Sequence, residues 1–137
     1  MGRVLGIDYG ARRIGLALSD PLKMIASPFK TLVNLSANKL MVELQNIISD
    51  NEVEAIVIGI PIGMQGQDTA QTKRVRHFAE TMADLGIPVS LEDERLSSVS
   101  ATRALTMQKI KTGFNKAKVD RTAAAIFLQQ YLDKQSR

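Results

Sequence analysis

Near the N-terminus, apolar and polar residues alternate with a period of two. Such alternation predicts β-strands, because successive side chains of a strand point to opposite faces of a sheet. Strands are expected at 3–10 ("RVLGIDYG"), at 13–20 ("RIGLALSD") and within 24–33 ("MIASPFKTLV"). The short connection between the first two predicts an antiparallel hairpin, and Pro28 predicts a bulge or an edge position in the third.

The rest of the chain has apolar residues at helical spacing, interrupted by two short apolar runs. These runs predict further strands at 55–61 ("AIVIGIP") and 87–93 ("IPVSLED"). Helices are expected from Ser36, a candidate N-cap, to Asp50, between the two runs, from Ser97 or Ser98 to Leu105, and from about Val119. The residues expected on buried helix faces are Leu40, Leu44, Ile47, Ile48, Val75, Phe78, Ala79, Met82, Ala123, Ile126, Phe127 and Tyr131.

The expected order, β-β-β-α-β-α-β-α-α, predicts an α/β fold with a mixed sheet of five strands and helices on its faces. Helical crossovers would make the first, fourth and fifth strands parallel neighbours. Their carboxyl ends then share one edge of the sheet, where α/β proteins tend to place their sites. The sequence has no repeat or long linker, so we expect a single domain over 1–137.

Composition and charge narrow the class of protein. The 137 residues are 45% hydrophobic and 23% charged, which is typical of a globular chain. The absence of Cys excludes disulfides, thiolate metal sites and a cysteine nucleophile. The longest apolar run, 55–62, is far shorter than the roughly 20 residues needed to span a bilayer, and Asp8 interrupts the first apolar segment, so we expect a soluble cytoplasmic protein. The net charge of +4 mildly favours a polyanionic partner.

Four carboxylates follow or begin elements that the topology brings to one edge. Asp8 ends the first strand, Asp93 and Glu94 follow the fifth, and Asp120 is expected in the first turn of the last helix, near the positive end of its dipole. Converging carboxylates repel one another unless a cation lies between them. Oxygen ligands suit Mg²⁺ or Mn²⁺, and two such ions would promote phosphodiester cleavage.

Each of these residues also has a simpler interpretation. Asp8 would serve as a cap of the hairpin turn, and Asp120 as a helix-start carboxylate. Asp93 or Glu94 would pair with Arg95 at the surface. The joint arrangement favours the metal site over these single roles.

Four motifs resemble, in order and spacing, those of the YqgF family. They are "GIDYGARRIGLALSD", "GIPIGMQG", "DERLSS" and "VDRTAAAIFLQQYL", and together they cover nearly the whole chain. This family comprises bacterial RNase H-like proteins described as pre-16S rRNA nucleases and, earlier, as Holliday junction resolvase-like proteins. The resemblance implies an RNase H-like fold whose first three strands are antiparallel.

The resemblance also implies a metal-dependent nuclease of the two-ion type, with Mg²⁺ or Mn²⁺ as cofactor. It carries the catalytic, metal-holding carboxylates onto Asp8, Glu94 and Asp120, with Asp93 as the alternative to its neighbour. The chain departs from the family's usual Pro-x-Asn-Met-Asp-Gly loop at Gly63 and Gln65, which puts a polar role for that loop in doubt.

Basic residues near the predicted site are candidates for contacts with a phosphate backbone, which supply affinity without sequence readout. A solvated helix face or loop is the simpler interpretation of any one of them. The candidates are Arg12, Arg13, Lys73, Arg74, Arg76, Arg95, Lys109, Lys111, Lys116, Lys118 and Arg121.

Three functional alternatives were weighed against a nuclease for precursor 16S rRNA. A resolvase for branched DNA would use the same carboxylates, and a symmetric junction would require a dimer; without an apolar seam, we expect a monomer. A non-catalytic module that binds RNA or a pre-ribosomal particle would not need three buried acids. A nucleotide-binding kinase-like protein would need a second domain, for which 137 residues leave no room.

Overall fold

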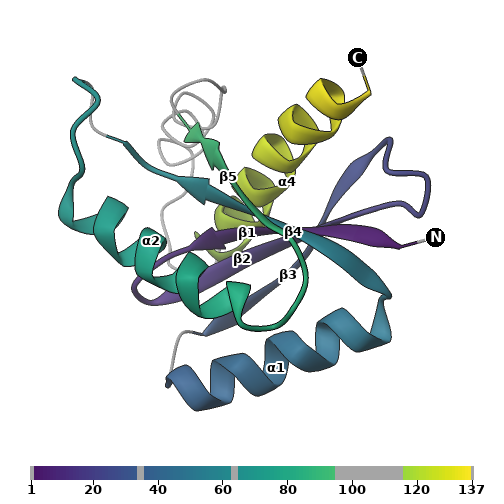
Figure 1. Ribbon diagram of the computed structural model, residues 1–137, viewed down its shortest axis with the longest axis horizontal. Helices are drawn as coiled ribbons and strands as arrows, with labels where there is room; N and C mark the ends of the chain where they lie inside the picture. Colours follow the sequence, from purple (N-terminus) through teal and green to yellow (C-terminus); the bar gives the residue numbers. More distant parts are fainter. Residues whose placement is uncertain (1, 34–35, 63–64, 95–115, 137) are drawn as a thin grey trace.

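The computed structural model describes residues 2–33, 36–62, 65–94 and 116–136, and it contains one five-stranded sheet (Figure 1). The sheet order is β3-β2-β1-β4-β5. The strands are β1 (Arg3–Tyr9), β2 (Arg13–Ser19), β3 (Ala26–Val33), β4 (Val53–Ile60) and β5 (Val89–Asp93). The described helices are α1 (Ala37–Asp50), α2 (Ala70–Ala83) and α4 (Lys116–Gln135). The helix predicted between Ser97 or Ser98 and Leu105 lies outside the described residues.

The strand directions confirm the predicted mixed sheet. β1 pairs antiparallel with β2, and β2 pairs antiparallel with β3. β1 pairs parallel with β4, and β4 with β5, so the first, fourth and fifth strands are parallel neighbours as predicted. Pro28 lies in the edge strand β3, and the register of the β2–β3 pair shifts between Leu16 and Ala17, which pairs with Pro28. Both expectations for this proline are confirmed.

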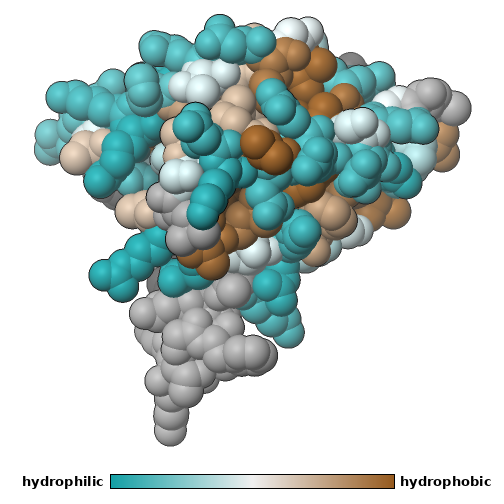
Figure 2. Space-filling model, turned by 90° about the horizontal axis from the view of Figure 1, so that it is seen from below, coloured by the Kyte–Doolittle hydropathy of each residue, from teal (hydrophilic) through white to brown (hydrophobic). Residues whose placement is uncertain are grey.

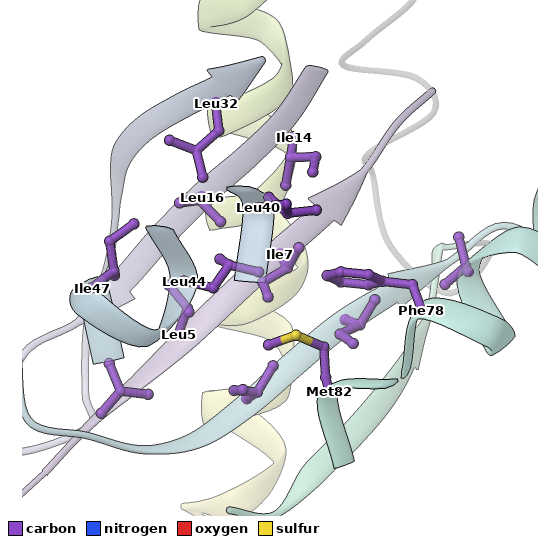
Figure 3. Packing of buried hydrophobic residues seen from close by; sticks show 14 of the residues in the cluster. Leu5, Ile7, Ile14, Leu16, Leu32, Leu40, Leu44, Ile47, Phe78 and Met82 are labelled. Atoms are coloured by element: carbon purple, nitrogen blue, oxygen red, sulfur yellow. The ribbon is translucent and has the colours of Figure 1, made fainter. Parts of the chain in front are cut away.

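One face of the sheet packs against α1 and α2. Leu5 and Ile7 of β1 are fully buried here and lie among side chains of α1 and α2, including Leu44 and Phe78 (Figure 3). Of the residues predicted on these helices, Leu40, Leu44, Ile47, Val75, Phe78 and Met82 are buried, and Ile48 and Ala79 are partly buried. The side chain of Ser36 accepts a hydrogen bond from the Lys39 backbone N–H at 3.3 Å, which confirms the predicted N-cap.

The opposite face packs against α4 (Figure 1). Gly6 and Gly59 lie under this helix, and a Cβ on Gly59 would meet the Phe127 ring at 2.5 Å. Missing side chains on the sheet therefore let α4 approach closely. Ala123 and Phe127 are buried as predicted, Ile126 and Tyr131 are partly buried, and the sequence interpretation missed the buried Leu128 and Leu132.

The start of α4 corrects one prediction. The helix begins at Lys116 rather than near Val119, so Asp120 is its fifth residue and lies in the second turn. The expected stabilisation of Asp120 by the helix dipole is therefore wrong, because that effect is confined to the first turn. In the part of the chain that the structure describes, no helix is long and apolar enough to cross a membrane.

The β2–β3 hairpin is closed by Asp20. Its Oδ1 accepts hydrogen bonds from the backbone N–H groups of Met24 (2.8 Å) and Ile25 (2.9 Å). These bonds favour the carboxylate over the acid, and they hold the pKa of Asp20 below its usual value of 3.8, with the Ile25 bond the larger cause.

The Asp20 carboxyl should therefore titrate below pH 3.8 in the folded chain. Because the folded pKa is depressed, the stabilisation is present above pH 3.8 and is lost as the pH falls through the lower folded pKa. An NMR titration of the carboxyl resonance measures this, and the same resonance in the urea-unfolded chain should return to the usual value. A folded-state midpoint at or above the unfolded one would contradict the hydrogen-bond assignment.

Candidate active site

The side chain of Asp8 lies on the face of the sheet that α4 covers. Along β1, Val4 and Gly6 contact α4, whereas Leu5 and Ile7 pack on the α1–α2 side. Strand alternation places Asp8 on the same face as Val4 and Gly6. Asp8 is the next-to-last residue of β1 and is partly buried, so its carboxylate reaches the sheet edge where β1, β4 and β5 end.

A glycine on the neighbouring strand brings Asp120 toward Asp8. Gly15 of β2 is the register partner of Asp8. A Cβ built on Gly15 would lie 2.2 Å from the backbone oxygen of Asp120, so the helix backbone occupies the space of a side chain there. Because Asp8 is opposite Gly15 and Gly15 contacts Asp120, two predicted carboxylates lie on adjacent positions of one face.

Asp120 has a basic partner at the start of β2. Arg13 Nε donates a hydrogen bond to Asp120 Oδ2 at 2.7 Å, and the two side chains are 33% and 19% exposed. Arg13 lies two residues before Gly15, and hence on the same face of β2. This pair joins residues 107 positions apart and fastens the N-terminal part of α4 to the sheet.

The residues at the end of β5 differ in the face of the sheet on which they lie. Glu92 is the register partner of Gly59 and is buried against α4, where Gln130 Nε2 donates to its Oε1 at 2.6 Å and Lys134 forms an ion pair with it. Asp93 is one residue further along and therefore faces the α1–α2 side. Glu94 directly follows the strand and is buried, at 7% exposed.

Asp8, Glu94 and Asp120 come from elements that meet near one edge of the sheet, but the structure does not gather them into a ligand cluster. No group of three or more His, Cys, Asp or Glu side chains placed to hold a metal ion occurs among the described residues. The donor set is nevertheless composed of carboxylate oxygens alone, which fits Mg²⁺ or Mn²⁺ and does not fit zinc.

Comparison with known proteins decides the family. The family model described as "RuvX: Holliday junction resolvase" matches residues 2–134 of the chain. The chain belongs to the RuvX family, also called YqgF. A protein from Roseiflexus sp. (strain RS-1) named "Putative pre-16S rRNA nuclease" is 40% identical over 135 residues, covering 98% of this chain and 96% of the relative. One of the same name from Endomicrobium trichonymphae is 41% identical over 138 residues, covering 99% of each.

Solved structures similar to this RuvX-family chain support the fold. The structure of T. thermophilus RuvC in complex with a Holliday junction substrate has a TM-score of 0.55 at 15% identity, covering 99% of this chain and 96% of that one. A second Thermus thermophilus RuvC structure has a TM-score of 0.51 at 14% identity, covering 98% and 96%. The family, the RNase H-like fold and the nuclease class predicted from the sequence are confirmed.

Some of the predicted phosphate-binding residues lie in the β1–β2 turn, which follows Asp8, or near the start of α4, which contains Asp120. Arg12 is exposed in the turn, one residue before the Asp120 partner Arg13. Lys118 is exposed near the start of α4, and Arg121 donates from Nη1 to Thr31 Oγ1 at 3.3 Å. Arg95, Lys109 and Lys111 lie outside the described residues, as do Gly63 of the family loop and the side chain of Lys116.

Helix α2 brings a second group of basic residues to the same edge. Its N-terminus is fixed there because Gln71 Nε2 donates to the backbone oxygen of Tyr9 at 2.8 Å, and the buried Thr72 hydroxyl donates to the backbone oxygen of Pro61. Lys73 and Arg74 follow directly and are exposed.

Arg76, also on α2, is already paired. It contacts Asp68 through Nε at 3.0 Å and Nη2 at 3.2 Å, and this guanidinium holds the pKa of the Asp68 carboxyl below its usual value. A phosphate would therefore have to compete with Asp68 for Arg76, whose two hydrogen bonds to Asp68 are its main partners. Lys73 also acts on Asp68, but through charge attraction and as the weaker of the two basic residues.

A groove of about 600 Å³ lies away from the carboxylates, between β3 and α1. Leu32, Leu40 and Val42 line it, and the exposed Val33 extends its apolar surface. Figure 2 shows the molecule from the side on which α1 lies in Figure 1, where apolar side chains gather among hydrophilic ones. Asp8 is on the opposite face, so this groove is not part of the candidate active site.

Sequence reasoning missed two contacts that attach α4 to the sheet. The buried Glu92, which bonds to Gln130 and Lys134, was passed over within the acidic run 92–94. The Arg13 contact with Asp120 had no local signal, because its partners are far apart in the sequence.

Proposed function

We propose that this RuvX-family chain is a divalent-metal-dependent nuclease that cleaves structured RNA during maturation of the 16S rRNA precursor. One observation carries the proposal: Asp8 and Asp120 lie on adjacent positions of one sheet face because Gly15 admits the backbone of α4. In a nuclease family, a pair of carboxylates at this edge is best explained as an ion-holding site.

Asp8, Glu94 and Asp120 would hold the ions, Mg²⁺ or Mn²⁺. The chemistry that such ions supply is activation of a water and neutralisation of charge on the leaving oxygen of the phosphodiester. The protein's own part is positional: β1, β5 and α4 present the three carboxylates, and exposed basic residues hold the strand. The exposed candidates are Arg12 in the β1–β2 turn, Lys118 near the start of α4, and Lys73 and Arg74 of α2. Arg121 is partly buried and would have to leave Thr31 to contact a phosphate.

An RNA substrate is favoured over branched DNA because the relatives named for RNA are more similar in sequence to this chain than the DNA-bound structure is. Proteins named for precursor 16S rRNA are 40–41% identical to this chain over nearly their full length. The RuvC structure with a Holliday junction is only 15% identical. The family's own description as a resolvase keeps cleavage of four-way junctions as the second candidate.

A cleavage assay with both substrates in parallel tests the proposal. We expect the purified full chain to cut a 5′-extended 16S rRNA precursor in Mg²⁺ or Mn²⁺ and to lose this activity in excess chelator. Preferential cutting of a four-way DNA junction would support the second candidate. Metal-independent binding of precursor RNA without any cleavage would instead identify a non-catalytic ribosome-associated module.

A further inference from the structure

The contact between Arg13 and Asp120 has a geometry that suggests more than a surface ion pair. Both side chains are partly buried, at 33% and 19% exposed, and the bond is 2.7 Å long. Asp120 is also the one proposed ion-holding residue that comes from a helix rather than from the end of a strand. Its carboxylate therefore depends on contacts with the sheet to be held in place.

Strand β2 supplies both of those contacts from a single face. Gly15 leaves room for the backbone of Asp120, and Arg13, two residues earlier, reaches the side chain of the same residue. The backbone position and the side-chain rotamer of Asp120 are thus determined by neighbouring residues of one strand, directly beside the register partner of Gly15, which is Asp8.

The bond also leaves the carboxylate able to bind a cation. It joins Arg13 Nε to Oδ2 of Asp120, so Oδ1 is outside it. An ionised carboxylate has about four acceptor sites on its two oxygens, so one hydrogen bond fixes its rotation without using up its capacity for a metal. Carboxylates that bind metals are commonly oriented by such a second hydrogen bond.

We propose that Arg13 is a positioning residue that orients Asp120 for divalent-metal binding. The inference rests on the proposed function, since it takes Asp120 as an ion-holding residue. It assigns to Arg13 an action through Asp120, in addition to the contact with substrate phosphate expected from its position beside the β1–β2 turn.

The charge of Arg13 lets the direction of the change in metal affinity distinguish an orienting role from a purely electrostatic one. Removing a positive charge near a cation site by itself raises the affinity for the cation, because it removes repulsion. Loss of an orienting partner lowers the affinity, typically by about 10–100-fold. A weaker affinity in an Arg13 variant therefore reports lost orientation and cannot arise from the change in charge.

Titration calorimetry with Mn²⁺ on the full chain, without nucleic acid, gives the readout. Arg13→Gln should bind Mn²⁺ about 10–100-fold more weakly than the unmodified chain. The matched control is Arg12→Gln, which removes the same charge from the adjacent, exposed residue and should bind at least as tightly as the unmodified chain. Unchanged binding by Arg13→Gln would mean that the arginine only braces α4, and tighter binding would mean that it competes with the metal; either result overturns the proposal.

Two further measurements distinguish loss of the positioning role from a failure to fold and from a failure of the proposed function. Arg13→Lys keeps the charge but lacks the planar Nε–H, so it should also bind Mn²⁺ more weakly, and it carries the test if Arg13→Gln fails to fold. If the unmodified chain binds Mn²⁺ with the expected Arg13 dependence but cleaves neither substrate, the proposed function fails and the positioning role stands. If the unmodified chain binds no Mn²⁺, both fail.

Discussion

Replacing Asp8 with Asn should lower metal-dependent cleavage by more than about 100-fold, because even the partners of metal ligands contribute about 10–100-fold. The substitution keeps the size of the side chain and removes its charge. Asp8 lies near the end of β1 and is only partly buried, so the fold should be retained. Nucleic-acid binding should persist, since the exposed basic residues that would hold the phosphate backbone are unchanged.

Cleavage rates and fluorescence-anisotropy binding on the same RNA substrate measure these two effects separately. Asp84→Asn is a suitable control, because it removes the same charge from an exposed residue at the far end of α2. The control should cleave like the unmodified chain. Equal cleavage by Asp8→Asn would remove Asp8 from the site and with it the main support for the nuclease mechanism.

Gly15→Ala should destabilise the fold by about 3 kcal/mol, near the upper end of the usual cost of overpacking. The added methyl group would lie 2.2 Å from the backbone oxygen of Asp120 and 2.7 Å from the backbone nitrogen of Arg121. Backbone atoms cannot rotate away as a side chain would, so α4 must shift from β2. The same shift would move Asp120 from Asp8 and weaken Mn²⁺ binding.

Urea unfolding followed by circular dichroism measures this loss, with Gly6→Ala as the matched control. Gly6 lies on the neighbouring strand, under the same helix, but a Cβ there would meet Leu128 Cβ at 3.0 Å and the backbone oxygen of Ala124 at 3.2 Å. A shift of a few tenths of an ångström relieves these contacts, whereas the 2.2 Å contact at Gly15 requires a much larger one, so the control should lose clearly less stability. Equal losses would show that α4 is not held rigidly at Gly15.

The sequence alone was sufficient for the elements that bury apolar residues periodically. The strands around Leu5 and Ile58 and the helix containing Leu44 follow from spacing, because the sheet and the helices must hide those side chains. The parallel arrangement of β1, β4 and β5 follows from the crossover rule, which predicts that Asp8 and Glu94 lie near a common edge of the sheet.

Contacts between distant residues could not be predicted in this way. The Arg13–Asp120 and Glu92–Lys134 pairs depend on how α4 crosses the sheet, which neither residue type nor local spacing determines. The start of α4 was also predicted too late, because no apolar periodicity marks the polar residues before Val119. The face of the sheet on which Asp93 lies likewise depends on the register of β5 against β4.

Helix α4 is attached to the sheet at both of its ends. Near its start Asp120 bonds to Arg13 of β2, and near its end Gln130 and Lys134 bond to Glu92 of β5. The strands β2 and β5 are not neighbours, since β1 and β4 lie between them. The helix thus spans four strands as a brace, so a change in the twist of the sheet would strain one of its two attachments.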